Sequence, residues 1–400
     1  MVEIGLTRAL TDERARLAGR RLGLIVNPTS VDSSFAHTAD LLVAAGLDVR
    51  ALLGPEHGVR GDVQYMAGVA DARDARTGLP VYSLYGDTEA SLTPTPAMLA
   101  DLDALVFDIQ DVGARYYTYV WTLLLAMKAA ARAGLEVIVL DRPNPIGGLA
   151  ADVEGAGIEP GFESFVGLHS VATRHGLSAG ELARLSNAEL GLGCRLTVLA
   201  MRGWRRGDHW AATGLPWVIP SPNMPSPTTA LVYPGMCLLE GTTLSEGRGT
   251  TLPFELFGAP WLEPELLAAR LGALGLPGVR FRPCSFRPTW NKHAGELCGG
   301  VQLHVHDAVS FRPVRTGIAA LWAAASLSRE RGRGEFAWHT EAYEFVRDRK
   351  AIDLLAGSSA LREGLDAGAS FAALCAPLPA AEAAFRAARA PHLLYPEASP

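Results

Sequence analysis

Several signals that would assign a protein to a particular class are missing from this chain. No apolar run approaches the roughly 20 residues that a membrane-spanning helix needs, so we expect no membrane segment. The five cysteines are odd in number, widely spaced and never arranged as Cys-x-x-Cys. We therefore expect reduced, mostly buried thiols, no disulfide framework and no metal site.

Basic clusters are also missing. The formal net charge is -6, and neither blocks of Lys and Arg nor basic residues interleaved with aromatics occur. Because such patches hold phosphate backbones and anionic lipids, we expect no nucleic-acid partner and no membrane partner. Residues 1–21 mix acidic and basic side chains and lack the apolar middle of a secretory signal. This composition favours a cytoplasmic location.

Phosphate-binding glycine loops are absent as well. The first predicted strand is the apolar run 22–26, and the turn after it reads Asn-Pro-Thr-Ser rather than Gly-x-Gly-x-x-Gly. No Gly-x-x-x-x-Gly-Lys-Ser/Thr sequence occurs anywhere. Since these loops hold the phosphates of dinucleotides and of ATP, we expect neither of them, and no other cofactor. An enzyme acting on phosphorylated metabolites is disfavoured for the same reason.

The chain does contain a regular alternation of short apolar strands with helices, and its length of 400 residues suits two domains. Strands are predicted at 22–26, 49–53, 81–85, 104–109, 136–140 and 195–201, and helices at 36–45, 116–132 and 178–190. Apolar strands separated by helices are typical of a parallel sheet covered on both faces. We predict a Rossmann-like, doubly wound α/β domain over residues 1–254.

The pattern changes beyond about residue 255. Helices are predicted at 265–274, 318–327, 341–349 and 380–390, and strands at 279–286 and 301–306. This mixture indicates a smaller α+β auxiliary domain over residues 255–400.

Polar side chains follow the predicted parallel strands at the point where each strand ends. In chain order they are Asn27, Glu56 with His57, Asp87, Asp108 with Asp111, and Asp141 with Asn144. Right-handed crossovers place these ends on one edge of the sheet, so we expect a shared polar rim. A single member such as Asp111 is explained equally well as a helix cap. Glu56 and His57 set a carboxyl group and an imidazole side by side, which makes them candidates for chemistry.

Two later loops carry further candidates. Residues 217–227 hold four prolines, which exclude a helix and fix an extended loop containing Asn223. Residues 240–250 combine Glu240, Glu246 and Arg248 with four hydroxyl groups and three glycines. This density of polar groups is typical of a binding loop. A simple pairing of Glu246 with Arg248 is the alternative.

Seven motifs occur in the order that one family has them. They are Gly-Pro-Glu-His-Gly-Val-Arg-Gly (54–61), Thr-Gly-Leu-Pro-Val-Tyr-Ser-Leu-Tyr-Gly (77–86), Asp-Ile-Gln-Asp-Val-Gly-Ala-Arg-Tyr-Tyr-Thr-Tyr (108–119), Leu-Asp-Arg-Pro-Asn-Pro (140–145), Pro-Ser-Pro-Asn-Met-Pro (220–225), Leu-Glu-Gly-Thr-Thr-Leu-Ser-Glu-Gly-Arg-Gly-Thr (239–250) and Lys-His-Ala-Gly-Glu-Leu-Cys-Gly-Gly-Val-Gln (292–302). Together they resemble the exo-acting β-N-acetylmuramidases of bacterial cell-wall recycling.

The resemblance implies a glycosidase that removes N-acetylmuramic acid from the non-reducing end of peptidoglycan fragments. It also implies an active site in the cleft between the Rossmann-like domain and the auxiliary domain. By motif, the catalytic glutamate of the family falls on Glu56. A non-catalytic protein that binds muramyl sugars is the alternative, and the expected partners are small peptidoglycan-derived saccharides in either case.

Glycoside hydrolysis usually needs one carboxylic acid as proton donor and a second group that acts on the anomeric carbon or on water. Desolvation of Glu56 in its turn would raise its proton affinity and suit it to the donor role. For the second group we rank Glu246 and Asp108 first, ahead of Asp111 and Glu240. Retaining, inverting and substrate-assisted routes, the last through the 2-acetamido group, all stay open.

The lactyl carboxylate of N-acetylmuramic acid favours a guanidinium partner, and the candidates are Arg60, Arg115 and Arg248. Tyr116 and Tyr117 offer a stacking face for the sugar, whereas burial is the better explanation for Tyr119 and Trp121. The remaining predicted substrate contacts are Asn27, His57, Asp111, Asp141, Asn144, Asn223 and Glu240.

Overall fold

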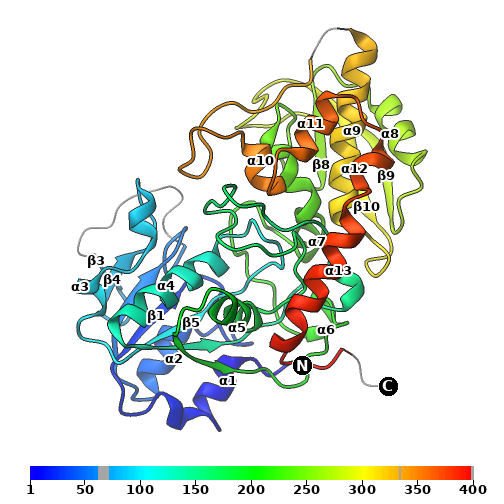
Figure 1. The fold of residues 1–400 in the computed structure, drawn as a ribbon. Helices are drawn as coiled ribbons and strands as arrows, with labels where there is room; N and C mark the ends of the chain where they lie inside the picture. The colour runs from blue at the N-terminus through cyan, green and yellow to red at the C-terminus, as the bar shows by residue number, and fades with distance from the viewer. Residues whose placement is uncertain (62–71, 333–334, 398–400) are drawn as a thin grey trace.

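The computed structural model describes residues 1–61, 72–332 and 335–397. Its two sheets lie in separate parts of the molecule (Figure 1), the larger at the lower left and the smaller at the upper right. The larger sheet has the strand order β3-β4-β2-β1-β5-β6-β7, and the smaller one the order β8-β10-β9. The predicted α/β architecture with a smaller α+β domain is confirmed.

The larger sheet has the Rossmann topology. Its strands are β1 (Leu22–Val26), β2 (Val49–Gly54), β3 (Ala72–Arg73), β4 (Pro80–Ser83), β5 (Ala104–Asp108), β6 (Glu136–Leu140) and β7 (Arg195–Leu199). All neighbouring strands pair in parallel except β3, which runs antiparallel to β4. The parallel strands therefore follow the order 3-2-1-4-5-6, which reverses direction between β1 and β5.

Helices cover both faces of this sheet. Alternate residues of a strand point to opposite faces, so Leu24 packs in the cluster beneath α1 (Gly5–Leu10) and α2 (Thr38–Ala44). Its neighbour Ile25 packs in the other cluster, which contains α4 (Tyr119–Ala133) and α5 (Ala179–Glu189). The short helices α3 (Pro96–Leu99) and α6 (Trp210–Thr213) complete this domain. Burial on both faces explains why the strands are apolar without alternation.

The smaller domain packs helices against an antiparallel sheet. Its elements are β8 (Leu256–Ala259), α8 (Pro264–Gly272), β9 (Val279–Phe286), β10 (Cys298–Val305), α9 (Pro313–Arg331), α10 (Ala351–Ala356), α11 (Ala360–Asp366), α12 (Phe371–Cys375) and α13 (Leu378–Arg389). The predicted boundary between residues 254 and 255 falls in the loop before β8 and stays a prediction.

Helix α7 (Pro227–Met236) joins the two parts by crossing α9 at a pair of glycines. A Cβ atom on Gly235 would lie 1.8 Å from the carbonyl oxygen of Pro313, and one on Gly317 would lie 2.1 Å from the carbonyl oxygen of Gly235. The helix backbones are therefore in direct contact at a point where no side chain fits.

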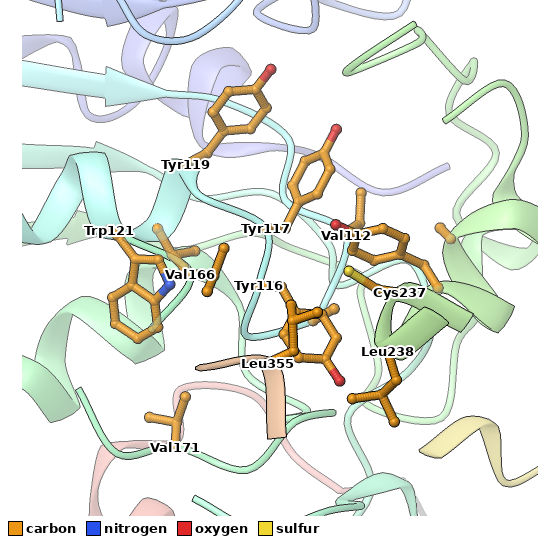
Figure 2. Close-up of a cluster of buried hydrophobic side chains, with 14 of the residues drawn as sticks. Val112, Tyr116, Tyr117, Tyr119, Trp121, Val166, Val171, Cys237, Leu238 and Leu355 are labelled. Atoms are coloured by element: carbon orange, nitrogen blue, oxygen red, sulfur yellow. The ribbon is translucent and has the colours of Figure 1, made fainter. Parts of the chain in front are cut away.

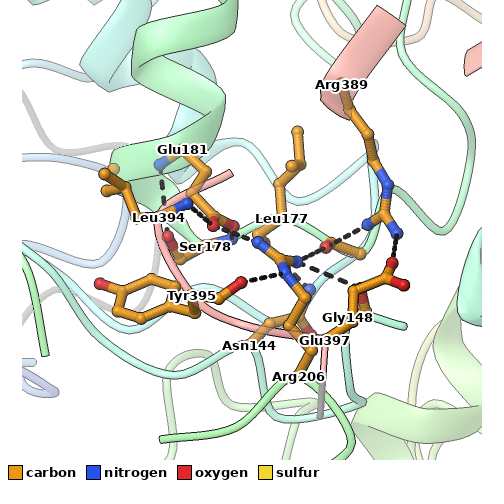
Figure 3. A network of polar contacts seen from close by, with 12 residues as sticks. Asn144, Gly148, Leu177, Ser178, Glu181, Arg206, Arg389, Leu394, Tyr395 and Glu397 are labelled. Atoms are coloured by element: carbon orange, nitrogen blue, oxygen red, sulfur yellow. Dashed lines mark hydrogen bonds and ion pairs between the residues drawn. The ribbon is translucent and has the colours of Figure 1, made fainter. Parts of the chain in front are cut away.

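Residues 394–397 return to the larger domain, where Figure 3 shows a buried polar network around them. Arg206 donates hydrogen bonds to the carbonyl oxygens of Tyr395, Gly148 and Gly176, and it pairs with the carboxylate of Glu181. The same carboxylate accepts the backbone N–H of Leu394 at 2.7 Å. Helix α13 thus runs from the smaller domain to the larger one, as Figure 1 shows in red.

One predicted helix is wrong. Residues 341–349 form turns instead, in which the backbones of Tyr343 and Val346 exchange two hydrogen bonds of 2.9 Å. Between them, Glu344 and Phe345 have positive φ angles of 45° and 70°, which no α-helix contains. Smaller differences are that β4 ends at Ser83 and that α4 begins only at Tyr119, two and three residues inside the predicted ranges.

In the described ranges, no helix combines the length and the apolar character that crossing a membrane requires. All five cysteines are free thiols, and three of them are buried, namely Cys194, Cys237 and Cys298.

Candidate active site

A cavity of about 1720 Å³ opens between the two domains. The larger domain contributes the turn after β2, the end of β4 and the segment that leads from β5 into α4. The opposite wall comes from the loops around residues 221–223, 248–251, 286–291 and 343–345. The cavity therefore uses the carboxyl ends of parallel strands, which is where ligands bind in this class of fold.

Glu56 lies in this wall, two residues beyond the end of β2. The turn is tight, with φ angles of 71° at His57 and 74° at Gly58, and it leaves the Glu56 side chain about one third exposed. Thr118 donates a long hydrogen bond of 3.4 Å to one Glu56 oxygen, and His57 Nε2 lies 3.9 Å from the other.

Burial raises the pKa of Glu56 above its ordinary value. The positive charge of Arg248 and the hydrogen bond from Thr118 oppose this rise, while the negative charge of Glu240 adds to it. A carboxyl group with a raised pKa in a cavity is suited to hold and donate a proton.

Arg248 and Glu240 form an ion pair on the opposite wall. Nη2 of Arg248 lies 2.8 Å from Oε1 of Glu240, whose other oxygen accepts a hydrogen bond of 2.8 Å from the Tyr343 hydroxyl. The guanidinium also lies 5.3 Å from the centre of the Phe254 ring. Arg248 is thus a fixed cation, and its charge acts on the Glu56 carboxyl group.

Glu344 is a third carboxyl group on the cavity wall. Its side chain is half-buried at the tip of the turn formed by Tyr343 and Val346. Burial, together with the charges of Glu56 and Glu240, raises the pKa of Glu344 to about 8. The Arg248 charge opposes this rise without cancelling it.

Aromatic rings form the floor between these groups, and Figure 2 shows Tyr116, Tyr117 and Tyr119 along one segment of the chain. Tyr117 meets Tyr119 edge to face at 5.2 Å, and Tyr233 meets Tyr117 at 5.8 Å. All four rings line the cavity, although each is less than a tenth exposed. Trp121 is fully buried, which confirms its prediction as a core residue.

The fifteen predicted site residues all belong to the described part of the chain, and eight of them line the cavity. These eight are Glu56, His57, Arg60, Tyr116, Tyr117, Asn223, Glu240 and Arg248. Arg60 is held by the carboxylates of Asp40 and Asp74, at 2.8 and 2.9 Å. The cavity thus gathers predicted residues that lie as much as 192 positions apart in the sequence, from Glu56 to Arg248.

The structure does not bring Asp108 to the cavity. This carboxylate is fully buried where the sheet order reverses, and it binds the Arg142 guanidinium and the Thr38 hydroxyl. Asn27 is buried beside it and accepts hydrogen bonds from the backbone and hydroxyl of Thr29. These internal bonds satisfy the polar groups where the sheet order reverses, and the large cavity lies instead beyond the ends of β2 and β4.

Four further predicted residues are buried away from the cavity, where their side chains make hydrogen bonds to other parts of the chain. Arg115 donates to the carbonyl oxygens of Ala156, Val171 and Leu355, the last of which lies in α10 at 2.6 Å. Asp141 binds the Tyr395 hydroxyl, Asn144 bridges to Leu177, and Asp111 accepts the backbone N–H of Gly113.

Glu246 lies behind the cavity wall. Its side chain is 1% exposed, with Lys292 Nζ at 3.0 Å and Arg248 Nη1 at 3.8 Å. Burial opposes ionisation, but these two cations outweigh it and hold the pKa of Glu246 below its usual value. Glu246 is therefore an ionised group that positions Arg248, so we do not carry it forward as the second catalytic carboxyl group.

The sequence analysis missed Tyr343 and Glu344. Both fell in a range predicted as helix, and their contact with the cavity depends on positive φ angles that a Glu-Phe pair does not signal. The hydrogen bond from Tyr343 to Glu240 joins residues 103 positions apart, so no local sequence pattern could predict it.

Across residues 1–61, 72–332 and 335–397, no group of three or more His, Cys, Asp and Glu side chains is placed to hold a metal ion.

Comparison with known proteins places this chain in a family. The profile described as "Exo-beta-N-acetylmuramidase NamZ, N-terminal" matches residues 22–228, and its C-terminal counterpart matches residues 231–395. A relative from Bacillus subtilis (strain 168), the peptidoglycan beta-N-acetylmuramidase NamZ, is 45% identical over 370 residues, which cover 92% of this chain and 85% of the relative.

Two crystal structures of DUF1343 family proteins from Bacteroides fragilis NCTC 9343 are also similar. One is 38% identical with a TM-score of 0.89, covering 98% of this chain and 99% of its own. The other is 27% identical with a TM-score of 0.77, and the match covers both chains completely. The chain therefore belongs to the exo-β-N-acetylmuramidase family to which NamZ belongs.

Proposed function

We propose that this chain is an exo-acting glycoside hydrolase that releases N-acetylmuramic acid from the non-reducing end of peptidoglycan fragments. The observation that carries the proposal is Glu56, which has a raised pKa and lies in the wall of the cavity between the domains. The 45% identity to a peptidoglycan β-N-acetylmuramidase supports the choice of substrate.

Glu56 is the proposed proton donor. Its proton passes to the glycosidic oxygen as the bond from that oxygen to the anomeric carbon breaks, and water supplies the new oxygen at that carbon. Thr118 and His57 border the carboxyl group and hold its orientation. The aromatic rings of Tyr117 and Tyr119 line the same cavity, and partial burial there raises the pKa of Glu56.

Arg248 is the proposed partner of the lactyl carboxylate that distinguishes N-acetylmuramic acid from N-acetylglucosamine. It is the predicted guanidinium whose charge acts on Glu56, so a sugar bound at Glu56 lies within its reach. Arg60 lines the cavity too, but its Nε, Nη1 and Nη2 atoms all donate hydrogen bonds to Asp40 or Asp74. Nε of Arg248, in contrast, has no hydrogen-bond partner among the described residues. The cytoplasmic location and the remaining substrate contacts stay predictions.

Replacing Glu56 by Gln tests the proposal. The amide keeps the shape of the side chain but holds no transferable proton, so release of N-acetylmuramic acid from a chromogenic muramide should fall by at least about 100-fold. The matched control is Glu89→Gln, an exposed glutamate of the same domain, which should keep full activity. Calorimetric binding of a muramyl ligand without turnover by the unaltered protein would instead support a sugar-binding protein.

A further inference from the structure

The turn that carries Glu344 is strained in a specific way. Tyr343 and Val346 exchange two backbone hydrogen bonds, so residues 343–346 form a two-residue hairpin turn. Both central residues have positive φ, a conformation that Gly and Asn adopt readily and that costs a bulky residue free energy. Glu344 and Phe345 occupy these positions, so other contacts must hold the turn in place.

Contacts with two separate parts of the chain fix this turn. On one side, the Tyr343 hydroxyl donates to Glu240 at 2.8 Å. On the other side, the Phe345 ring packs edge to face against Tyr85 at 6.4 Å and against Phe165 at 6.5 Å, both of which belong to the larger domain. Figure 1 shows the segment before α10, in orange, extending from the smaller domain toward the larger one.

The anchored turn places Glu344 in the same cavity as Glu56, with the carboxyl group approaching from the other domain. The charged groups that act on it are Glu56, Glu240 and Arg248, and the Tyr343 ring is its neighbour in the chain. Glu240 is already bound to Arg248 and Tyr343, and Glu246 is buried behind the wall. Glu344 is thus the carboxyl group of this cluster that has neither an ion pair nor a catalytic assignment in the described part of the chain.

We propose that Glu344 is the second carboxyl group of the reaction and that it shares one exchangeable proton with Glu56 across the cavity. This inference rests on the proposed function and adds a residue from the smaller domain to its machinery. Two carboxyl groups whose charges act on each other in one cavity cannot both ionise readily, so such a pair keeps one proton over a wide pH range. The value of about 8 for the pKa of Glu344 agrees with a pair that is still singly protonated at neutral pH.

The hydrolysis leaves the pair with the same number of protons that it held at the start. The protonated member of the pair gives its proton to the glycosidic oxygen as the bond to the anomeric carbon breaks. The oxygen of water forms the new bond to that carbon, and a proton from the water returns to the ionised member. The pair then holds one proton again, and both sugars leave as hydroxyl compounds.

Glu344→Gln tests this assignment in the full-length protein. With a disaccharide that carries N-acetylmuramic acid at its non-reducing end, kcat should fall by on the order of 100-fold or more while KM changes little. The control is Glu341→Gln, an exposed residue of the same segment, which should keep full activity. The pH profile of kcat/KM gives a second reading, because the unaltered protein should lose activity above about pH 8, where the pair loses its last proton.

Two results would overturn the assignment. One is a folded Glu344→Gln variant with activity within threefold of the unaltered protein. The other, which needs no variant, is a kcat/KM that stays constant to pH 9.5. An unaltered protein that releases no N-acetylmuramic acid from any muramide would contradict the proposed function itself, and this outcome differs from either of the two above.

Discussion

For individual side chains, the surroundings of each carboxyl group decide whether it is ionised at neutral pH. Glu246 lies near two cations and is ionised, whereas burial and the negative charges of Glu56 and Glu240 raise the pKa of Glu344 to about 8. The two residues have the same chemistry in the sequence. Only the three-dimensional neighbours separate a structural carboxylate from a candidate acid.

The raised pKa of Glu344 also predicts how stability depends on pH. Because the folded protein binds this proton more tightly than the unfolded chain, its stabilising contribution is complete below about pH 4.5 and is lost as the pH rises through about 8. Glutamine at position 344 does not titrate. The difference in melting temperature between Glu344→Gln and the unaltered protein should therefore grow in favour of the variant from pH 5 to pH 8.

Thermal unfolding monitored by circular dichroism at several pH values measures this difference. Glu341→Gln, with its exposed side chain, should show no such trend. A difference that stays constant or shrinks toward pH 8 would mean that Glu344 ionises normally in the folded protein.

Among the secondary-structure elements, the crossing of α7 with α9 is tightly constrained, because the two helix backbones touch at Gly235 and Gly317. Gly235→Ala should destabilise the protein by about 3 kcal/mol or more, because its methyl group meets a backbone oxygen of α9 that cannot move aside. Chemical denaturation in urea gives the free energy of unfolding. The control is Gly272→Ala at the end of α8, where an added Cβ meets nothing within 4 Å. Equal stability of the two variants would show that the helices separate freely.

The elements of the larger sheet could be predicted because each strand is a continuous apolar run, and this property is local. Leu22–Val26 and Glu136–Leu140 match their predicted ranges, and α5 lies within the predicted helix 178–190, with a capping box of Ser178 and Glu181 at its start. The segment 341–349 could not be predicted, since its conformation depends on the contact of Phe345 with rings in the other domain. Tertiary contacts there override the local preference for a helix.

For the protein as a whole, the buried network in Figure 3 ties the end of the chain to the larger domain. Arg206→Ala should lower the free energy of unfolding by about 3–5 kcal/mol, because it leaves the buried Glu181 carboxylate without its cation. Urea denaturation measures this loss. Arg205→Ala, an exposed neighbour, is the matched control. A loss below 1 kcal/mol for Arg206→Ala would mean that the network contributes little to stability.

The arrangement of the domains explains why the candidate site could be predicted only in part. The motif around Glu56 and the loop of Glu240 and Arg248 were recognisable, and the structure brings them to one cavity. The strand ends at Asn27, Asp108 and Asp141 have the same polar character, but internal partners bind them. Which strand ends stay open depends on how the smaller domain covers the rim, and no local pattern encodes that.

The most direct test of the proposed function compares two isomeric disaccharides of N-acetylmuramic acid and N-acetylglucosamine joined by a β-1,4 bond. The purified protein is incubated with each isomer, and free N-acetylmuramic acid is quantified by mass spectrometry. We predict hydrolysis of the isomer with N-acetylmuramic acid at the non-reducing end and none of the reverse isomer. Equal cleavage of both isomers, or cleavage of neither, would contradict an exo-acting muramidase.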